Sequence, residues 1–329
     1  MGGQVRVSEG ALELPGGATV RFMRTLRLPE TGTHPLPPGL GGFPLRWAAD
    51  YPDQAPEQWL GHGGVLLPVF QREAVWLSFS ASAPVALQVG VGQVCAVSGR
   101  PWSDHLAQDP QNYVVLPRQP WLDGINSGRG TIRQLVAVPP EPGAVTAPRG
   151  PAAEDWVGVQ LQVFELRARV RARWQAAQRA RAVRGRDVAG WGEVGGARPG
   201  RFGPAPGVPL AAPAAEAGPG EPAGPTVTAP GLGAGGRMRQ EVYRDPRPLD
   251  DWEREPSGRV FVHLATAAQW RRITGEPAPA SPVDRAAYAS AGLPWFEHYD
   301  ADAADMAAPA PGRTARLGDG QGQAADRER

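Results

Sequence analysis

Short apolar runs that end at proline or glycine fill the first half of this chain and leave little room for long helices. In the clearest run, Val85, Leu87, Val89 and Val91 fall at every second position, which is the period of a strand with one buried face. Similar runs of strand length occupy residues 18–28, 65–70, 74–79, 113–116, 131–138 and 157–163. Because proline disrupts both helix and sheet hydrogen bonding, this punctuation predicts many short strands in a mainly β, sandwich-like domain.

The strongest turn signal lies in residues 119–138. Asp123 and Gly124, followed by the glycine-rich residues 126–130, favour a tight turn, so residues 131–138 are expected to pair back as one arm of a hairpin. The sequence Gly-Thr-Ile-Arg-Gln at 130–134 is echoed as Gly-Arg-Met-Arg-Gln at 236–240. We interpret the echo as the start of a second module, with Arg133 and Arg239 as candidate binding residues at an internal docking surface.

The region after residue 231 predicts a small α+β module. Residues 238–243 and 260–264 have the composition of strands. A short helix is expected to start at Thr266, which forms a capping box with Gln269, and to end before Gly275. A second helix is expected between the cap Ser281, which Pro282 and Asp284 follow, and Gly292.

Positive charge is concentrated in one segment, Arg167 to Arg186, which contains no acidic residue. It reads either as an extension of the preceding strand or as a helix that is basic nearly all round, and its Ala, Gln and Arg content favours helix after about Ala172. The composition then collapses to Gly, Pro and Ala, which predicts disorder. The expected organisation is a β-sandwich-like domain at 1–166, the arginine-rich segment and disordered linker at 167–230, the α+β module at 231–305, and a tail at 306–329.

Composition excludes several classes of function. The chain has no lysine, and its 34 arginines nearly balance 33 acids for a net charge of +1, which argues against a globally electrostatic partner such as duplex DNA. Its single cysteine, Cys95, cannot form an internal disulfide, and no His or Cys cluster has metal-ligand spacing, so we expect no metal and no cofactor. With no signal core and no apolar run of membrane length, we expect a soluble, cytoplasmic protein.

Candidate functional residues are few. Asp104 and His105 suggest an acid and base pair, although adjacent residues rarely face each other, and Asp123 suits a turn better than acid catalysis. A hydrolytic site would assemble these three residues from loops at one end of the sandwich. Trp121 in the same stretch is a candidate for binding. The residues expected to grip phosphates or an acidic surface are Arg167, Arg169, Arg171 and Arg173.

Five segments carry a resemblance to known families. With residues 71–76 (Gln-Arg-Glu-Ala-Val-Trp), 119–125 (Gln-Pro-Trp-Leu-Asp-Gly-Ile) and 132–134 (Ile-Arg-Gln), the first domain resembles a family of uncharacterised microbial proteins, which implies no activity. Residues 235–240 with 279–299 resemble a segment that accompanies a ubiquitin-like domain in some fungal proteins. No ubiquitin fold is visible, and the resemblance, which covers about two thirds of the chain, transfers no catalytic residue.

The sequence favours a non-enzymatic binding or assembly protein that has a protein partner or associates with itself. One alternative is a hydrolytic enzyme with the loop-built site. The other is a polyanion-binding protein that uses the arginine-rich segment, although sequence-tolerant RNA binding is disfavoured because Trp174 is the one aromatic residue there that could stack on a base.

Overall fold

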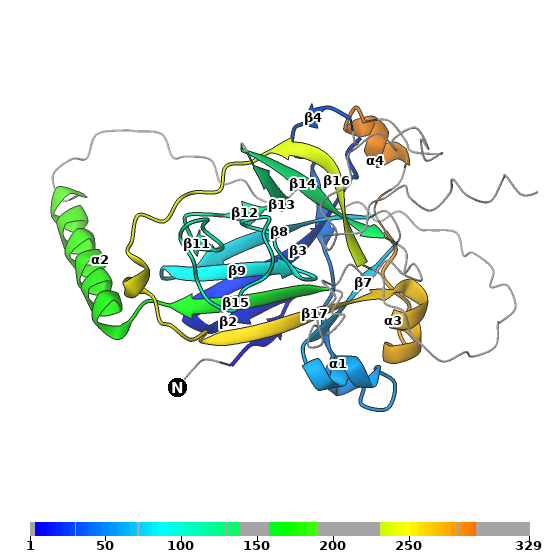
Figure 1. Ribbon diagram of the computed structural model, residues 1–329, viewed down its shortest axis with the longest axis horizontal. Helices are drawn as coiled ribbons and strands as arrows, with labels where there is room; N and C mark the ends of the chain where they lie inside the picture. The colour runs from blue at the N-terminus through cyan, green and yellow to red at the C-terminus, as the bar shows by residue number, and fades with distance from the viewer. Residues whose placement is uncertain are drawn as a thin grey trace, which may run out of the picture. The chain divides into compact units, whose positions relative to one another are not determined.

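The computed structural model describes residues 4–29, 31–70, 73–128, 130–138, 158–189, 231–281, 283 and 285–293. The chain divides into two units: one combines Met1–Arg167 with Thr228–Arg329, and the other is Ala168–Val227. The first unit consists mainly of strands in two sheets with short helices, which confirms the mainly β fold class (Figure 1).

The first sheet contains ten strands among the described residues, in the order β1-β2-β3-β8-β14-β16-β4, with β5, β12 and β13 paired to β3, β8 and β14. All its pairs are antiparallel except β16 with β4. The bounds are β1 Arg6–Ser8, β2 Ala11–Leu14, β3 Ala18–Thr25, β4 Thr33–His34, β5 Gly39–Gly42, β8 Ala74–Ala81, β12 Trp121–Leu122, β13 Gly124–Gly128, β14 Thr131–Val138 and β16 Gly231–Arg239.

The second sheet has the order β10-β9-β15-β17-β7-β6, with β11 paired to β9. Its bounds are β6 Arg46–Trp47, β7 Val65–Val69, β9 Val85–Val91, β10 Val94–Cys95, β11 Val114–Leu116, β15 Val159–Glu165 and β17 Gly258–Thr266. Strand β17 is antiparallel to β15 and parallel to β7.

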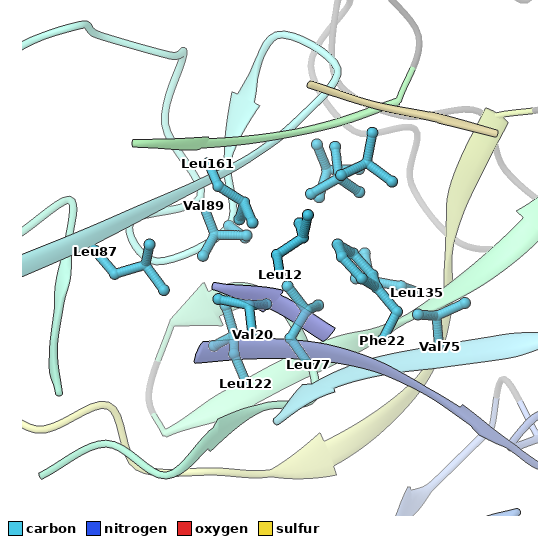
Figure 2. Close-up of a cluster of buried hydrophobic side chains, with 14 of the residues drawn as sticks. Leu12, Val20, Phe22, Val75, Leu77, Leu87, Val89, Leu122, Leu135 and Leu161 are labelled. Atoms are coloured by element: carbon cyan, nitrogen blue, oxygen red, sulfur yellow. The ribbon is translucent and has the colours of Figure 1, made fainter. Parts of the chain in front are cut away.

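One apolar cluster joins the two sheets. Leu12, Phe22 and Leu77 from the first sheet and Val89 and Leu161 from the second are at most 1% exposed and belong to the same buried cluster. Figure 2 shows these side chains facing one another between the strands. The alternation of apolar residues therefore makes a sandwich, because each strand places every second side chain between the sheets.

The C-terminal segment is part of this sandwich, in contrast to the separate module at 231–305 that the sequence suggested. Strand β16 lies between β14 and β4 in the first sheet, and β17 lies between β15 and β7 in the second. Val260, Val262 and Leu264 of β17 are buried in the shared core. The local sequence could not show this, because strand partners distant in the chain leave no periodic signal. Residues 294–305 lie outside the described residues.

Four α-helices and three short 3-10 helices occur in the described residues. The α-helices are α1 Glu57–His62, α2 Ala168–Ala189, α3 Ala267–Thr274 and α4 Arg285–Ser290; the 3-10 helices are η1 Pro15–Gly17, η2 Ala48–Asp50 and η3 Leu249–Asp251. The capping box of α3 is confirmed, since Thr266 Oγ1 accepts from Gln269 N at 3.1 Å and Gln269 Oε1 accepts from Thr266 N at 2.8 Å. Helix α4 begins at Arg285, and Pro282 and Asp284 lie outside the described residues.

The predicted turn at Asp123 and Gly124 and the predicted start of the arginine-rich helix need correction. Asp123 and Gly124 do not make the hairpin turn: Asp123 separates β12 from β13, and β13 reaches Gly128 before the chain reverses into β14. Helix α2 starts at Ala168, about one turn before the expected residue. The predicted disordered linker at 190–230 and tail at 306–329 lie outside the described residues.

Candidate binding surface

Glutamine side chains connect neighbouring segments that are not joined by the backbone hydrogen bonds of a β-sheet. Gln240 Nε2 donates to Trp121 O at 3.1 Å, and its Oε1 accepts from Asp123 N at 3.0 Å. In an extended strand, the C=O of one residue and the N–H of the second residue after it face the same edge. A side-chain amide can therefore take the place of one strand pair, and Gln240 does so for residues 121–123.

Two more glutamines hold the segment that follows β16. Gln119 Nε2 donates to Trp121 O at 3.0 Å and Glu241 O at 3.2 Å, while its Oε1 accepts from Tyr243 N at 3.0 Å. Gln111 repeats the pattern two residues further on, with Tyr243 O at 3.2 Å and Asp245 N at 2.8 Å. These bonds fix residues 241–245 against residues 111–121.

Asp245 anchors the far end of the same segment from inside the protein. Its fully buried side chain accepts from Tyr113 Oη at 3.0 Å and Trp252 Nε1 at 2.8 Å through Oδ2. Oδ1 accepts from the backbone N of Arg247 at 3.1 Å. Burial, and then the charge of Asp245, raise the pKa of Tyr113. The network keeps the segment rigid because every one of these donors is directed at one carboxylate.

Two large aromatic side chains project from these clamped segments. Trp121 is 40% exposed and Tyr243 is 43% exposed. The Arg118 guanidinium lies 5.4 Å from the centre of the Tyr243 ring, and its Nη1 donates to Arg244 O at 3.2 Å. Because Gln119 bonds to the backbone of both Trp121 and Tyr243, the two side chains start from neighbouring points. We call Arg118, Trp121 and Tyr243 the aromatic ridge.

Asp123 lies beneath the ridge and is 2% exposed. Its Oδ2 accepts from Trp121 Nε1 at 3.0 Å, and its Oδ1 has no hydrogen-bond partner in the described part of the chain. Burial raises the pKa of Asp123 to about 7, because the apolar surroundings disfavour the charged carboxylate. The carboxyl group that accepts the hydrogen bond of the Trp121 indole therefore has a pKa in the neutral range.

Asp104 and His105 lie in a loop between β10 and β11 that contacts the second sheet. Asp104 Oδ1 accepts from Trp102 Nε1 at 2.9 Å and from Gln162 Nε2 of β15 at 3.1 Å, and it pairs with Arg259 of β17. The backbone O of His105 accepts from Gln88 of β9. These contacts attach a loop to the outer side of the second sheet, and they share no residue with the hydrogen bonds of Asp123.

A cleft of about 790 Å³ lies near this loop. Its lining includes aromatic and charged side chains from five parts of the fold, among them Arg6, Trp47, Asp50, His62, Arg259 and Phe261. Within the described residues, no group of three or more His, Cys, Asp or Glu side chains could hold a metal ion. The cleft mixes both signs of charge, so it favours no ligand charge.

The echoed segments are neighbours in the first sheet. Ile132 of β14 lies opposite Met238 of β16, Arg133 lies opposite Arg237, and Thr131 lies opposite Arg239. Arg133 and Arg239 therefore belong to adjacent strands of one sheet and not to two modules. Arg167 packs differently: its Nε donates to Trp252 O at 3.1 Å, and it pairs with Asp250 at 3.7 Å. Arg169 and Arg173 are exposed on α2, where Arg171 is half-buried.

The glutamine clamps were not predicted, because Gln111, Gln119 and Gln240 lie outside the strands, where the alternation of residues carries no information about burial. The shared Arg-Gln ending of the two echoed segments was the available signal. Searches for relatives find no family model, no curated protein and no solved structure that matches this chain. Among the described helices, none combines the length and apolar character needed to span a bilayer.

Proposed function

We propose that this chain is a non-enzymatic binding or assembly protein and that the aromatic ridge is its contact surface for a protein partner or a second copy. One observation carries the proposal: Trp121 and Tyr243 are two of the four large hydrophobic side chains exposed in the described residues, and one glutamine fixes the backbone of both. The hydrogen bonds of the Gln119 side chain do not reach the backbone of the other two, Leu36 and Leu249.

The residue types support this use. Trp, Tyr and Arg dominate the small set of side chains that contribute most to protein interfaces. A surface that is already ordered loses less conformational entropy on binding. The clamps by Gln111, Gln119 and Gln240 supply that order, because each fixes two backbone groups at once. We place this activity in the cytoplasm, where the buried thiol of Cys95 stays reduced.

The test compares two double variants. Trp121→Ser with Tyr243→Ser removes both aromatic side chains of the aromatic ridge. Leu36→Ser with Leu249→Ser removes the other two exposed hydrophobic side chains and serves as the control. Light scattering over a range of concentrations measures self-association, and quantitative capture from extract identifies any partner. We expect association to be lost in the ridge variant and kept in the control. Equal behaviour of the two variants, or a wild-type protein that neither associates nor retains a partner, contradicts the proposal.

A further inference from the structure

Helix α2 is the one long helix in the described residues, and near its start Val170 is buried and Trp174 is half-buried. Seven of its 22 residues are arginine, and no acid precedes Asp187 (Figure 1, green). A turn of about 100° per residue places Arg169, Arg171, Arg173, Arg179 and Arg181 at about 0°, 200°, 40°, 280° and 120° around the axis. The four exposed arginines, Arg169, Arg173, Arg179 and Arg181, therefore cover an arc of about 200° around the helix, and Arg171 on the remaining side is half-buried.

The middle of the helix is open to solvent. All eight residues at 175–182, which make about two full turns, are exposed. A helix that is polar all round is ordinarily stabilised by pairs of opposite charge three or four residues apart, and α2 has no acid with which to form them before Asp187. Arg169 and Arg173 instead repel each other across one turn. An anionic partner would remove this repulsion.

The shape of the charge restricts the partner. A membrane surface binds helices that have an apolar face to insert, and the exposed residues 175–182 of α2 include no large apolar side chain. Single-stranded nucleic acid is bound through stacked aromatic side chains, and α2 has only Trp174. The major groove of B-form DNA is about 12 Å wide, admits an α-helix, and has phosphates on both sides. The corresponding groove of double-stranded RNA is narrow and deep.

We propose that α2 binds duplex DNA without sequence preference, by lying in the major groove with its arginines directed at the phosphates of both strands. The nearly neutral charge of the whole chain does not oppose this, because salt screens charges that lie more than about 10 Å from a phosphate, so the local charge of the helix dominates at the contact. This site is separate from the aromatic ridge and does not depend on the function proposed for it.

The experiment uses the full chain and a fluorescent duplex of about 20 base pairs, with fluorescence anisotropy measured from about 50 to 200 mM salt. One variant carries Arg173→Gln, Arg179→Gln and Arg181→Gln. The control carries Arg254→Gln, Arg271→Gln and Arg272→Gln, three exposed arginines of the sandwich unit. Both lower the net charge by three, and glutamine keeps helix propensity, so circular dichroism should match wild type.

We expect wild-type affinity to fall steeply with salt, and the helix variant to lose at least tenfold in affinity at the lowest salt. Its slope of log affinity against log salt should be smaller by about two to three, because each lost phosphate contact removes about 0.9. The control and the ridge variant Trp121→Ser with Tyr243→Ser should bind as wild type does. Equal losses in both triple variants overturn the proposal. Tighter binding to single-stranded DNA, to double-stranded RNA or to anionic lipid vesicles than to duplex DNA also overturns it.

Discussion

Ile132 and Met238 lie directly opposite each other on the antiparallel strands β14 and β16, at the centre of two five-residue segments that are identical at three positions. Each segment ends in a buried glutamine that clamps a third piece of chain. Gln134 Nε2 donates to Leu26 O at 2.8 Å and its Oε1 accepts from Leu28 N at 2.9 Å, as Gln240 does for Trp121 and Asp123. The echo thus marks a local two-fold arrangement within one sheet.

Gln134→Leu should lower the free energy of unfolding by about 2 to 4 kcal/mol, because it leaves two buried backbone groups without partners at about 1 to 3 kcal/mol each. Gln240→Leu should cost a similar amount, since it breaks the equivalent pair of bonds. Urea denaturation measures both. The control is Gln54→Leu, an exposed position. A loss at Gln134 no larger than the control's would show that the clamp contributes little.

Asp123→Asn should change how stability depends on pH. The folded pKa of about 7 lies above the unfolded value of about 3.9, so between these values the folded state keeps a proton that the unfolded state has released. The free energy of unfolding therefore falls as pH rises through this window, by about 1.4 kcal/mol per unit and about 4 kcal/mol in all. Asparagine does not titrate, so the variant lacks this contribution to the pH dependence of the free energy of unfolding. The stability of the variant relative to wild type should be greater at pH 8 than at pH 5, and a constant difference would contradict the prediction.

His263 should act in the opposite direction. It is fully buried, its Nε2 lies 2.6 Å from Gly63 O, and its ring stacks on Trp59. Burial lowers the pKa of His263 to about 4. Between about pH 6.5 and 4, the imidazole is therefore protonated in the unfolded state and neutral in the folded state. Stability is lost as pH falls from about 6.5 to 4, by about 1.4 kcal/mol per unit.

Asp123 and His263 partly cancel over that range, which gives a direct measurement. Denaturation at pH 4.5 and 6.5 should show a steeper loss toward acid in Asp123→Asn than in wild type. Adding His263→Gln to that variant should flatten the loss. Retention of the steep loss in the double variant would assign it to another group.

Gly124→Ala and Gly61→Ala should have effects of opposite sign. An added Cβ at Gly124 would collide with the backbone O of Arg133 on the paired strand, which cannot move without breaking the ladder. We expect a loss of at least about 2 kcal/mol. Gly61 lies in α1, and a Cβ there meets nothing within 4 Å. Alanine should stabilise the protein by about 0.5 to 1 kcal/mol. Thermal denaturation compares the two, and a stable Gly124→Ala protein would contradict the close approach.

The parts of the fold that the sequence could predict depend on neighbours in the chain. The strands around Val85 and Val159 follow from alternation, and the cap of α3 follows from the spacing of Thr266 and Gln269. The partners of β16 and β17 depend on contacts between distant residues. The prediction of a turn at Asp123 and Gly124 was wrong for a physical reason. The pair Asp-Gly is common in turns, but here Gly124 is required because the neighbouring strand leaves no room for a side chain.

The placement of β17 means that the sandwich is complete only when its last strand is in position. Until then β15 and β7 each present an open edge of unpaired backbone groups toward the same gap, and β14 presents another toward β16. Nascent chain that has been synthesised only to about residue 230 is therefore exposed to the edge-to-edge pairing that leads to aggregation. During synthesis, the protein has to remain unassociated until residues 258–266, which form β17, have been made.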